Sequence, residues 1–171
     1  MMGVESRGNY LIELGKKYRW LRGAELGVWY GETFFRLLDG LPDLFLIGVD
    51  DWRDNPRNVH HKDQNKNRES VYLKQRKYTD RSHILKMTTA RAARLVPDDD
   101  LDFVFIDADH RYQSFKDDII AWLPKVKPGG FLTGHDFDIP DVKKAVSEIL
   151  GQVECPEYSD FTWAWRKTDE T

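Results

Sequence analysis

Apolar runs of strand length alternate along this chain with segments whose apolar residues recur at helical spacing. Residues 101–106 show no alternation of polar and apolar positions, as expected for a strand that is buried on both faces. Residues 32–41 instead place Phe34, Leu37 and Leu41 on one helical face. Because strand and helix alternate in this way, the pattern predicts right-handed crossovers and a doubly wound α/β sheet.

The same pattern locates the remaining elements. Strands are expected at 21–26, 44–49, 83–87, 101–106 and 131–133, and a terminal antiparallel pair at 152–155 and 161–166. Helices are expected at 32–41, 68–78, 88–95, 112–123 and 142–150. The prediction is therefore a Rossmann-like seven-stranded sheet, mostly parallel, with an antiparallel C-terminal strand.

Two consecutive strands of this prediction end in carboxylates and imidazoles. Asp107, Asp109 and His110 follow 101–106, whereas His135 and Asp136 follow 131–133. Ligands of open parallel sheets bind in the crevice outside the carboxyl ends of the strands. We expect these five side chains to line one crevice, as a group suited to a divalent cation, to proton transfer, or to both.

Composition narrows the class of protein. A chain of 171 residues with 40% hydrophobic positions fits a single globular domain over residues 1–171. The net charge of −3 gives no drive toward nucleic acid or anionic lipid. Cys155 is the one cysteine, and neither a signal peptide nor a membrane span is recognisable. We therefore expect a cytoplasmic protein without nucleic-acid or membrane partners.

Residues 51–80 depart from the alternating pattern, because they are long, polar and basic and contain His60 and His61. Two interpretations remain open. The segment is either a solvated connection or a flap that covers the crevice and contacts the substrate.

The first crossover carries a glycine turn. Gly27 permits a tight turn and Gly31 a close approach of ligand or helix. Asp50 ends the second strand, where an acid commonly accepts hydrogen bonds from ribose hydroxyls. The G-x-x-x-G spacing differs from the G-x-G-x-x-G of dinucleotide sites, and Glu25 would repel a phosphate. These features predict an adenosine-containing cofactor with a positively charged amino acid moiety.

At this point the chain resembles class I S-adenosylmethionine (SAM)-dependent methyltransferases. Glu25-Leu-Gly-Val-Trp-Tyr-Gly31 looks like their first motif, Asp50 like their ribose acid, and Thr88-Thr-Ala90 falls where they contact adenine. The resemblance runs from Ala24 to Arg166. The residues that it implies for SAM binding are Glu25, Leu26, Gly27, Gly31, Asp50, Asp51, Trp52, Thr89, Ala90 and Asp107.

A closer resemblance is to metal-dependent small-molecule O-methyltransferases. Ile106-Asp-Ala-Asp-His-Arg-Tyr112 and Gly129-Gly-Phe-Leu-Thr-Gly-His-Asp-Phe137 look like their segments after strands four and five. The resemblance implies Mg²⁺ or a similar divalent cation at Asp107 and Asp136. Phe137 replaces the Asn of many members, and an antibiotic-biosynthesis branch aligns His135 with a ligand position.

The implied function is SAM-dependent methylation of a hydroxyl on a small molecule. The implied metal ligands are Asp107, His135 and Asp136, with Asp138 as another candidate, and His110 or His135 would act as the base. Orienting the reactants supplies ~7–11 kcal/mol by itself, so a metal-free version with a His base is workable.

Other functions stay open. Tyr112 and Lys116 form the Y-x-x-x-K of NAD(P)-dependent short-chain oxidoreductases, although their helix turns apolar residues to the core. A nucleic-acid methyltransferase is disfavoured by the net charge of −3. A non-catalytic SAM-binding protein would use the same fold. The aromatic C-terminal edge, Phe161-Thr-Trp-Ala-Trp165, could pair with a second copy as a homodimer.

Overall fold

The computed structural model describes residues 3–54 and 63–168, with the side chains of residues 3–5 left out. Its strands are β1 (Arg22–Leu26), β2 (Phe45–Asp50), β3 (Ser82–Lys86), β4 (Leu101–Ile106), β5 (Val126–Gly134) and β6 (Trp163–Arg166). Its α-helices are α1 (Gly3–Tyr18), α2 (Glu32–Gly40), α3 (Gln64–Gln75), α4 (Thr89–Ala92), α5 (Tyr112–Trp122) and α6 (Pro140–Leu150). Short 3₁₀ turns are η2 (Arg76–Tyr78), η3 (Ala93–Leu95), η4 (Leu123–Lys125) and η5 (Glu157–Ser159).

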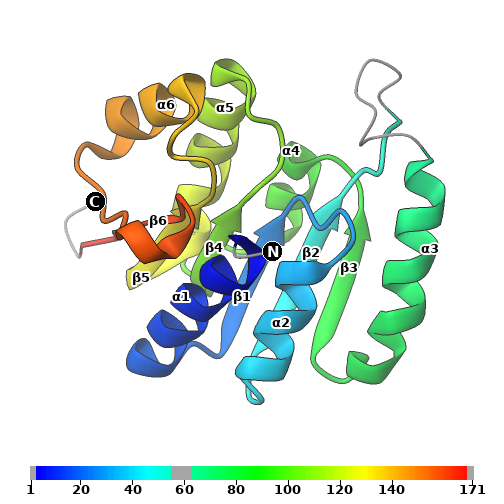
Figure 1. Cartoon of the computed structure of the whole chain (residues 1–171). Coiled ribbons are helices and arrows are strands. Elements are labelled where there is room, and N and C mark those ends of the chain that lie inside the picture. Colours follow the sequence, from blue (N-terminus) through cyan, green and yellow to red (C-terminus); the bar gives the residue numbers. More distant parts are fainter. Residues whose placement is uncertain (1–2, 55–62, 169–171) are drawn as a thin grey trace.

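The strands form one sheet in the order β3-β2-β1-β4-β5-β6, in which β6 runs antiparallel to β5 and the other pairs are parallel (Figure 1). This confirms the predicted doubly wound α/β fold with an antiparallel C-terminal strand. The chain first builds outward from β1 to β3 and then crosses to β4, so the strand order reverses between β1 and β4. Such a reversal opens a crevice at the carboxyl ends of the two strands.

The sheet of the described residues has six strands rather than the expected seven. Residues 152–155 form no strand, and Glu154 alone pairs with Ala164 of β6 in an isolated bridge. The N–H and carbonyl of Glu154 both bond Ala164, at 2.9 and 2.8 Å. Pro156, two residues later, has no N–H to continue the ladder, and the chain turns into η5.

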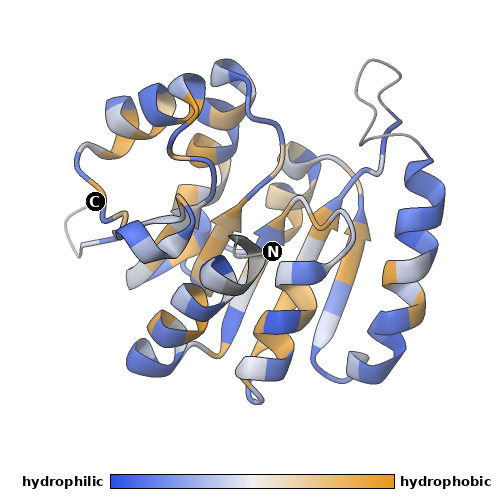
Figure 2. Cartoon of the chain, in the orientation of Figure 1, coloured by the Kyte–Doolittle hydropathy of each residue, from blue (hydrophilic) through white to orange (hydrophobic). Residues whose placement is uncertain are grey.

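Two apolar cores fill the two faces of the sheet. Helices α1, α2 and α3 cover one face and α4, α5 and α6 the other, with the apolar strands between them (Figures 1 and 2). The first core includes Leu11, Phe34, Phe35, Val71, Phe103 and Phe105. The second includes Leu26, Ile106, Phe115, Ile119, Trp122, Val146 and Trp163. The sheet is therefore buried on both faces, and ligands reach it at its edges.

Helix α1 was not predicted from the sequence. It buries Tyr10, Leu11 and Leu14, and it packs beside α2 and η5. A side chain at Gly8 would approach Cδ of Arg36 to 2.2 Å, so glycine permits this close packing of α1 on α2. Its first turns lie at the edge where the parallel strands end (Figure 1).

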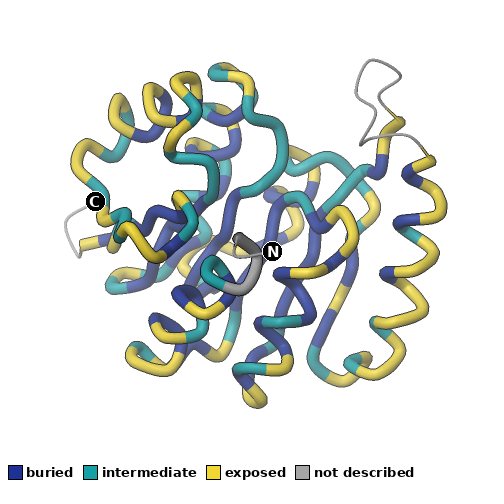
Figure 3. The backbone as a smooth tube through the Cα atoms, viewed as in Figure 1, coloured by how far each residue is buried: buried dark blue, intermediate teal, exposed yellow. Residues whose placement is uncertain are grey.

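The polar segment 51–80 contains α3, which begins before the helix predicted over 68–78. Val71 and Asn67 are buried, whereas most of the helix is exposed (Figure 3). The described part of the segment is therefore a mostly exposed helix, which is compatible with both interpretations. His60 and His61 lie outside the described residues. None of the described helices combines the length and the hydropathy that crossing a membrane requires.

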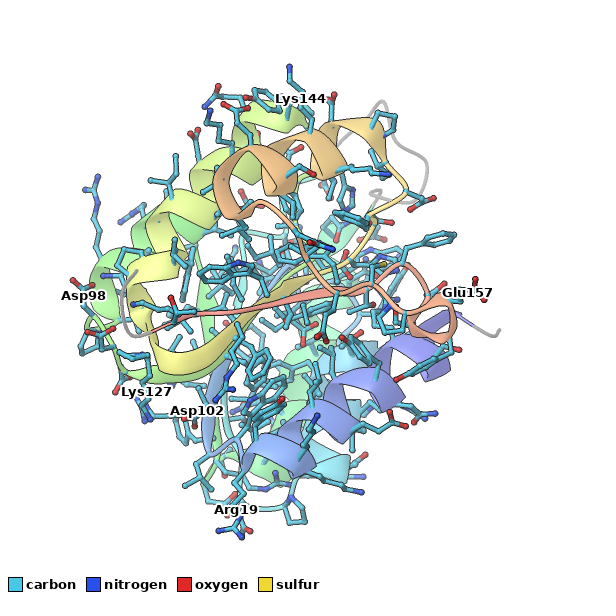
Figure 4. All side chains as sticks on the ribbon, turned by 90° about the vertical axis from the view of Figure 1, so that its left-hand side faces the viewer. Arg19, Asp98, Asp102, Lys127, Lys144 and Glu157 are labelled. Carbon is cyan, nitrogen blue, oxygen red and sulfur yellow. The ribbon has the colours of Figure 1, made fainter. Side chains whose placement is uncertain are left out.

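Charged residues hold together the amino ends of the strands, on the edge away from the crevice (Figure 4). Asp102 accepts hydrogen bonds from the backbone N–H groups of Leu21 and Arg22, both at 2.8 Å, and pairs with Lys127 at 3.1 Å. Asp98 pairs with Lys125 at 2.6 Å. These acids accept hydrogen bonds from backbone N–H groups at the strand ends and form ion pairs with basic side chains, so their role is structural.

Candidate active site

The turn between β1 and α2 packs directly against the end of β4. Gly27 has φ +89°, and a Cβ there would lie 2.0 Å from the carbonyl oxygen of Asp107. The N–H of Asp107 donates to the carbonyl of Leu26 at 2.8 Å, and Leu26 is fully buried. Gly31, with φ +78°, precedes α2 where a Cβ would lie 2.6 Å from the ring of Phe35. Glycine is therefore favoured at both positions, because a Cβ would collide with the Asp107 backbone at position 27 and with the Phe35 ring at position 31.

The carboxyl group of Glu25 is buried beneath this turn. Its residue is 2% exposed, and its Oε2 has no hydrogen-bond partner among the described residues. Burial, reinforced by the negative charge of Asp107, raises the pKa of Glu25 well above its usual value, whereas the charge of Arg7 lowers it. A buried acid without a partner is costly, so the site fits a cationic ligand group that would pair with it.

Asp50 ends β2 and organises the neighbouring loop. Its two carboxylate oxygens accept the N–H groups of Trp29 and Trp52 at 2.8 and 2.7 Å. Burial raises its pKa, and these backbone hydrogen bonds oppose the rise. Trp52 is buried in the first core and donates its indole N–H to the carbonyl of Trp29. Asp51, which is half-buried, accepts the N–H of Arg53.

The residues expected near adenine begin α4. Thr89 donates its hydroxyl to the carboxylate of Asp118, and its carbonyl accepts the indole N–H of Trp122 at 3.2 Å. Ala90 is exposed beside it. Asp118 was not expected from the sequence; it is 5% exposed, and burial raises its pKa to about 6 despite the Thr89 hydrogen bond.

The carboxyl ends of β4 and β5 bring together Asp107, His110 and Asp136. Nε2 of His110 lies 2.7 Å from Oδ2 of Asp136 and 3.5 Å from Oδ1 of Asp107. Each of the three side chains offers one ligand atom, and these atoms lie within 4.8 Å of one another. Two carboxylates and an imidazole are common ligands of divalent cations, so the donor set fits a metal ion.

The charges of this group are strongly coupled. Burial alone would lower the pKa of His110, but contact with Asp107 and Asp136 outweighs burial and raises it to about 10. Burial would raise the pKa of Asp136, but His110 and His135 hold it well below its usual range. A protonated His110 would therefore pair with both carboxylates.

His135 lies beside this group and is turned toward a different acid. Its Nδ1 is 3.1 Å from Oδ1 of Asp136 and 3.8 Å from Oδ1 of Asp107, and its Nε2 is 3.4 Å from Oδ2 of Asp160. Burial would lower its pKa, but the Asp136 contact and the charge of Asp107 raise it. The structure thus places His110, rather than His135, in the three-residue group that shares one ligand position.

The backbone after β5 turns sharply at Asp136. Asp136 has φ +58°, in the left-handed region, and its carbonyl accepts the N–H of Ile139 at 2.9 Å. Asp160 and Phe161 also have positive φ, and Phe161 accepts the N–H of Phe137. Non-glycine residues hold this conformation at a cost of about 1–3 kcal/mol and gather at functional sites.

The remaining expected residues lie at the rim. Asp109 accepts the N–H of Arg111 and pairs with its guanidinium. Asp138 is exposed, and Ile139 rather than Asp138 is the N-cap of α6. The hydroxyl of Tyr112 and the ammonium of Lys116 both pair with Glu148 on α6, which gives the Y-x-x-x-K pair a structural role.

Sequence reasoning missed Arg7, because α1 was not predicted. The Nη1 of Arg7 lies 2.7 Å from Oδ2 of Asp107, and the side chain of Arg7 is only 13% exposed. Tyr10, Leu11, Leu14 and Tyr18 have helical spacing and would have revealed the helix. No local signal in the sequence would have paired residues that lie 100 positions apart.

Solved structures with the same fold are distant in sequence. A candidate caffeoyl-CoA O-methyltransferase from Staphylococcus aureus is 14% identical with a TM-score of 0.72, covering 94% of this chain and 82% of that chain. The SAH-bound methyltransferase PaMTH1 of Podospora anserina is 14% identical with a TM-score of 0.70, and the match covers 95% of this chain and 78% of that chain. The O-methyltransferase NovP is 21% identical with a TM-score of 0.68, and the match covers 98% of this chain and 80% of that chain.

Two curated relatives are uncharacterized proteins. The y4gI protein of Sinorhizobium fredii is 26% identical over 69% of this chain, and the R132 protein of Acanthamoeba polyphaga mimivirus is 31% identical over 36%. The chain spans 13% and 29% of their respective lengths.

The family comparison matches the segment that carries the site. The model of a methyltransferase domain aligns with residues 24–137, more than half of the 171 residues. That segment begins just before the Glu25 turn and ends just after Asp136. The chain therefore belongs to the methyltransferase-domain family.

Proposed function

We propose that this protein transfers the methyl group of SAM to a hydroxyl of a small molecule, assisted by a divalent cation. The observation that carries the proposal is the position of Asp107. Its backbone packs against the Gly27 turn and bonds Leu26, while its side chain belongs to the group with His110 and Asp136. One residue thus joins the candidate cofactor turn to the candidate acceptor site.

The cofactor side has residues that suit SAM. The unpartnered Oε2 of Glu25 would pair with the ammonium of the methionine moiety, and the glycine turn would leave room for backbone approach. Asp50, at the end of β2, would lie near the ribose. The relationship to the methyltransferase-domain family supports this assignment.

The acceptor side would perform the proton transfer. Asp107, His110 and Asp136 would hold the cation, which when bound lowers the pKa of a coordinated hydroxyl. His135 would accept the hydroxyl proton, and Asp160 lies 3.4 Å from its Nε2 to orient the ring. The oxygen would then take the methyl group as the sulfonium becomes the thioether of S-adenosylhomocysteine (SAH).

The test is methyl transfer from isotopically labelled SAM to a panel of catechols, sugars and other hydroxylated metabolites, followed by mass spectrometry. Product should form with Mg²⁺ or Mn²⁺, and it should fall sharply with EDTA and in Asp136→Asn. Asp109→Asn, which alters a neighbouring acid paired with Arg111, is the matched control. Tight NADH binding without SAH binding would contradict the proposal and favour an oxidoreductase. SAH binding without turnover on any acceptor would instead favour a non-catalytic SAM-binding protein.

A further inference from the structure

Arg7 brings a largely buried positive charge to Asp107 from outside the family-matched segment. It lies on α1, whereas the family model begins at residue 24. Its Nη1 contacts Oδ2 of Asp107 at 2.7 Å. Close packing of Gly8 against Arg36 fixes α1 on α2, so Arg7 is held by a rigid element.

The charge of Arg7 acts on both sides of the crevice. Arg7 lies against Asp107, whose backbone packs on the Gly27 turn and whose side chain belongs to the group with His110 and Asp136. Its Nε is buried and has no hydrogen-bond partner among the described residues. A buried donor without a partner is costly, so a ligand acceptor that reached this N–H would stabilise the site.

The amino acid moiety of SAM carries one ammonium and one carboxylate. Glu25 suits the ammonium, but the negative charges of Glu25 and Asp107 would repel the carboxylate unless a cation lay beside it. A guanidinium is the side chain best matched to a carboxylate, because its planar N–H groups can form two parallel hydrogen bonds.

Building on the proposed function, we propose that Arg7 binds the carboxylate of the methionine moiety of SAM while Glu25 binds its ammonium. Helix α1 is then part of the cofactor site rather than a structural addition to the methyltransferase domain. When the cofactor binds, Arg7 divides its N–H groups between the ligand carboxylate and Asp107.

The test is isothermal titration calorimetry with two ligands, SAH and decarboxylated SAH. The second ligand keeps the adenosine, the thioether and the ammonium but lacks the carboxylate. Wild-type protein should bind SAH more tightly than decarboxylated SAH. Arg7→Ala should weaken SAH binding roughly 10- to 100-fold, the usual effect of losing hydrogen bonds to a charged group, and leave decarboxylated SAH nearly unchanged.

The matched control is Lys16→Ala, which removes an exposed positive charge from the same helix and leaves Arg7 and its contacts in place. This variant should keep the wild-type preference for SAH. Arg7→Lys, which retains the charge without the planar fork, should recover part of the preference.

Equal affinity of wild-type protein for the two ligands would overturn the assignment, even if Arg7→Ala fails to fold. An unchanged preference in a folded Arg7→Ala protein would overturn it as well. In both cases SAH binding would leave the proposed function intact. If wild-type protein binds neither ligand, the proposed function and the role of Arg7 fail together.

Discussion

Nε2 of His110 lies 2.7 Å from Oδ2 of Asp136, although the two residues follow different strands. The contact joins the carboxyl ends of β4 and β5, and Asp107 completes the group. The arrangement combines a sharp turn at Asp136, with φ +58°, and a loop after β4 that brings His110 back toward the sheet. Such a conformation is maintained only where surrounding structure supports it, as at binding sites.

Replacement of Asp136 by Asn should weaken the binding of Mn²⁺, because one of two anionic ligands is lost. The same loss is expected for Asp107→Asn, and each should exceed ~10-fold, since a charged ligand contributes more than about 1.4 kcal/mol. Titration calorimetry with MnCl₂ measures the change, with Asp109→Asn as the control. Equal Mn²⁺ affinity in wild type and Asp136→Asn would remove these residues from the metal site.

Replacement of Glu25 by Gln should have opposite effects on stability and on ligand binding. Burial raises the pKa of Glu25, so the neutral amide should raise the melting temperature of the ligand-free protein. The same change should lower SAH affinity, because the amide cannot pair with the ligand ammonium as an anion. Thermal unfolding with and without SAH tests both, and the exposed Asp43→Asn is the control. A variant that binds SAH as wild type does would exclude Glu25 from the cofactor site.

Gly27→Ala should be more destabilising than Gly129→Ala. Both glycines have positive φ, +89° and +78°, so alanine strains the backbone by about 1–2 kcal/mol at either position. A Cβ at Gly27 would in addition lie 2.0 Å from the Asp107 carbonyl oxygen, whereas at Gly129 the nearest atom is 3.6 Å away. Urea unfolding measures the free energy of unfolding of the two variants, and the difference between them reports the clash between the turn and the end of β4. Equal losses of unfolding free energy would show that the turn and the strand end move apart easily.

Asp118 should make the protein less stable as the pH rises from about 4 to about 6. Its pKa is raised from 3.8 to about 6, mainly by burial, so the folded state binds more protons than the unfolded state across this range. At about pH 8 the full cost applies, on the order of 3 kcal/mol, and it is absent below the unfolded pKa. Asp118→Asn, which can still accept the Thr89 hydrogen bond, should therefore be more stable than wild type near pH 8.

Urea unfolding at a series of pH values checks this, and the two proteins should converge near pH 4. The exposed Asp43→Asn, which removes a carboxylate that does not act on Asp118, is the control and should follow the wild-type profile. A constant difference between Asp118→Asn and wild type at all pH values would rule out titration of Asp118 as the cause.

Several features of the fold were predictable because they depend on local patterns. The apolar run 101–106 became β4 with the predicted bounds, and the carboxylates after β4 and β5 met because parallel strands end at one edge. The prediction failed where long-range contacts decide the outcome. Pairing of residues 152–155 stopped at Glu154, and Arg7 reached Asp107 through a helix that packs on α2. Which imidazole joins Asp107 and Asp136 likewise depends on loop geometry that strand spacing does not specify.

The most direct test of the central claim is a crystal structure of the protein with SAH and Mn²⁺, with the metal located by anomalous scattering. The account predicts SAH at the glycine turn, with its ammonium on Glu25 and its ribose toward Asp50. It also predicts one anomalous peak bound by Asp107, His110 and Asp136. SAH bound away from this turn, or an anomalous map without a peak between these three side chains, would contradict the account.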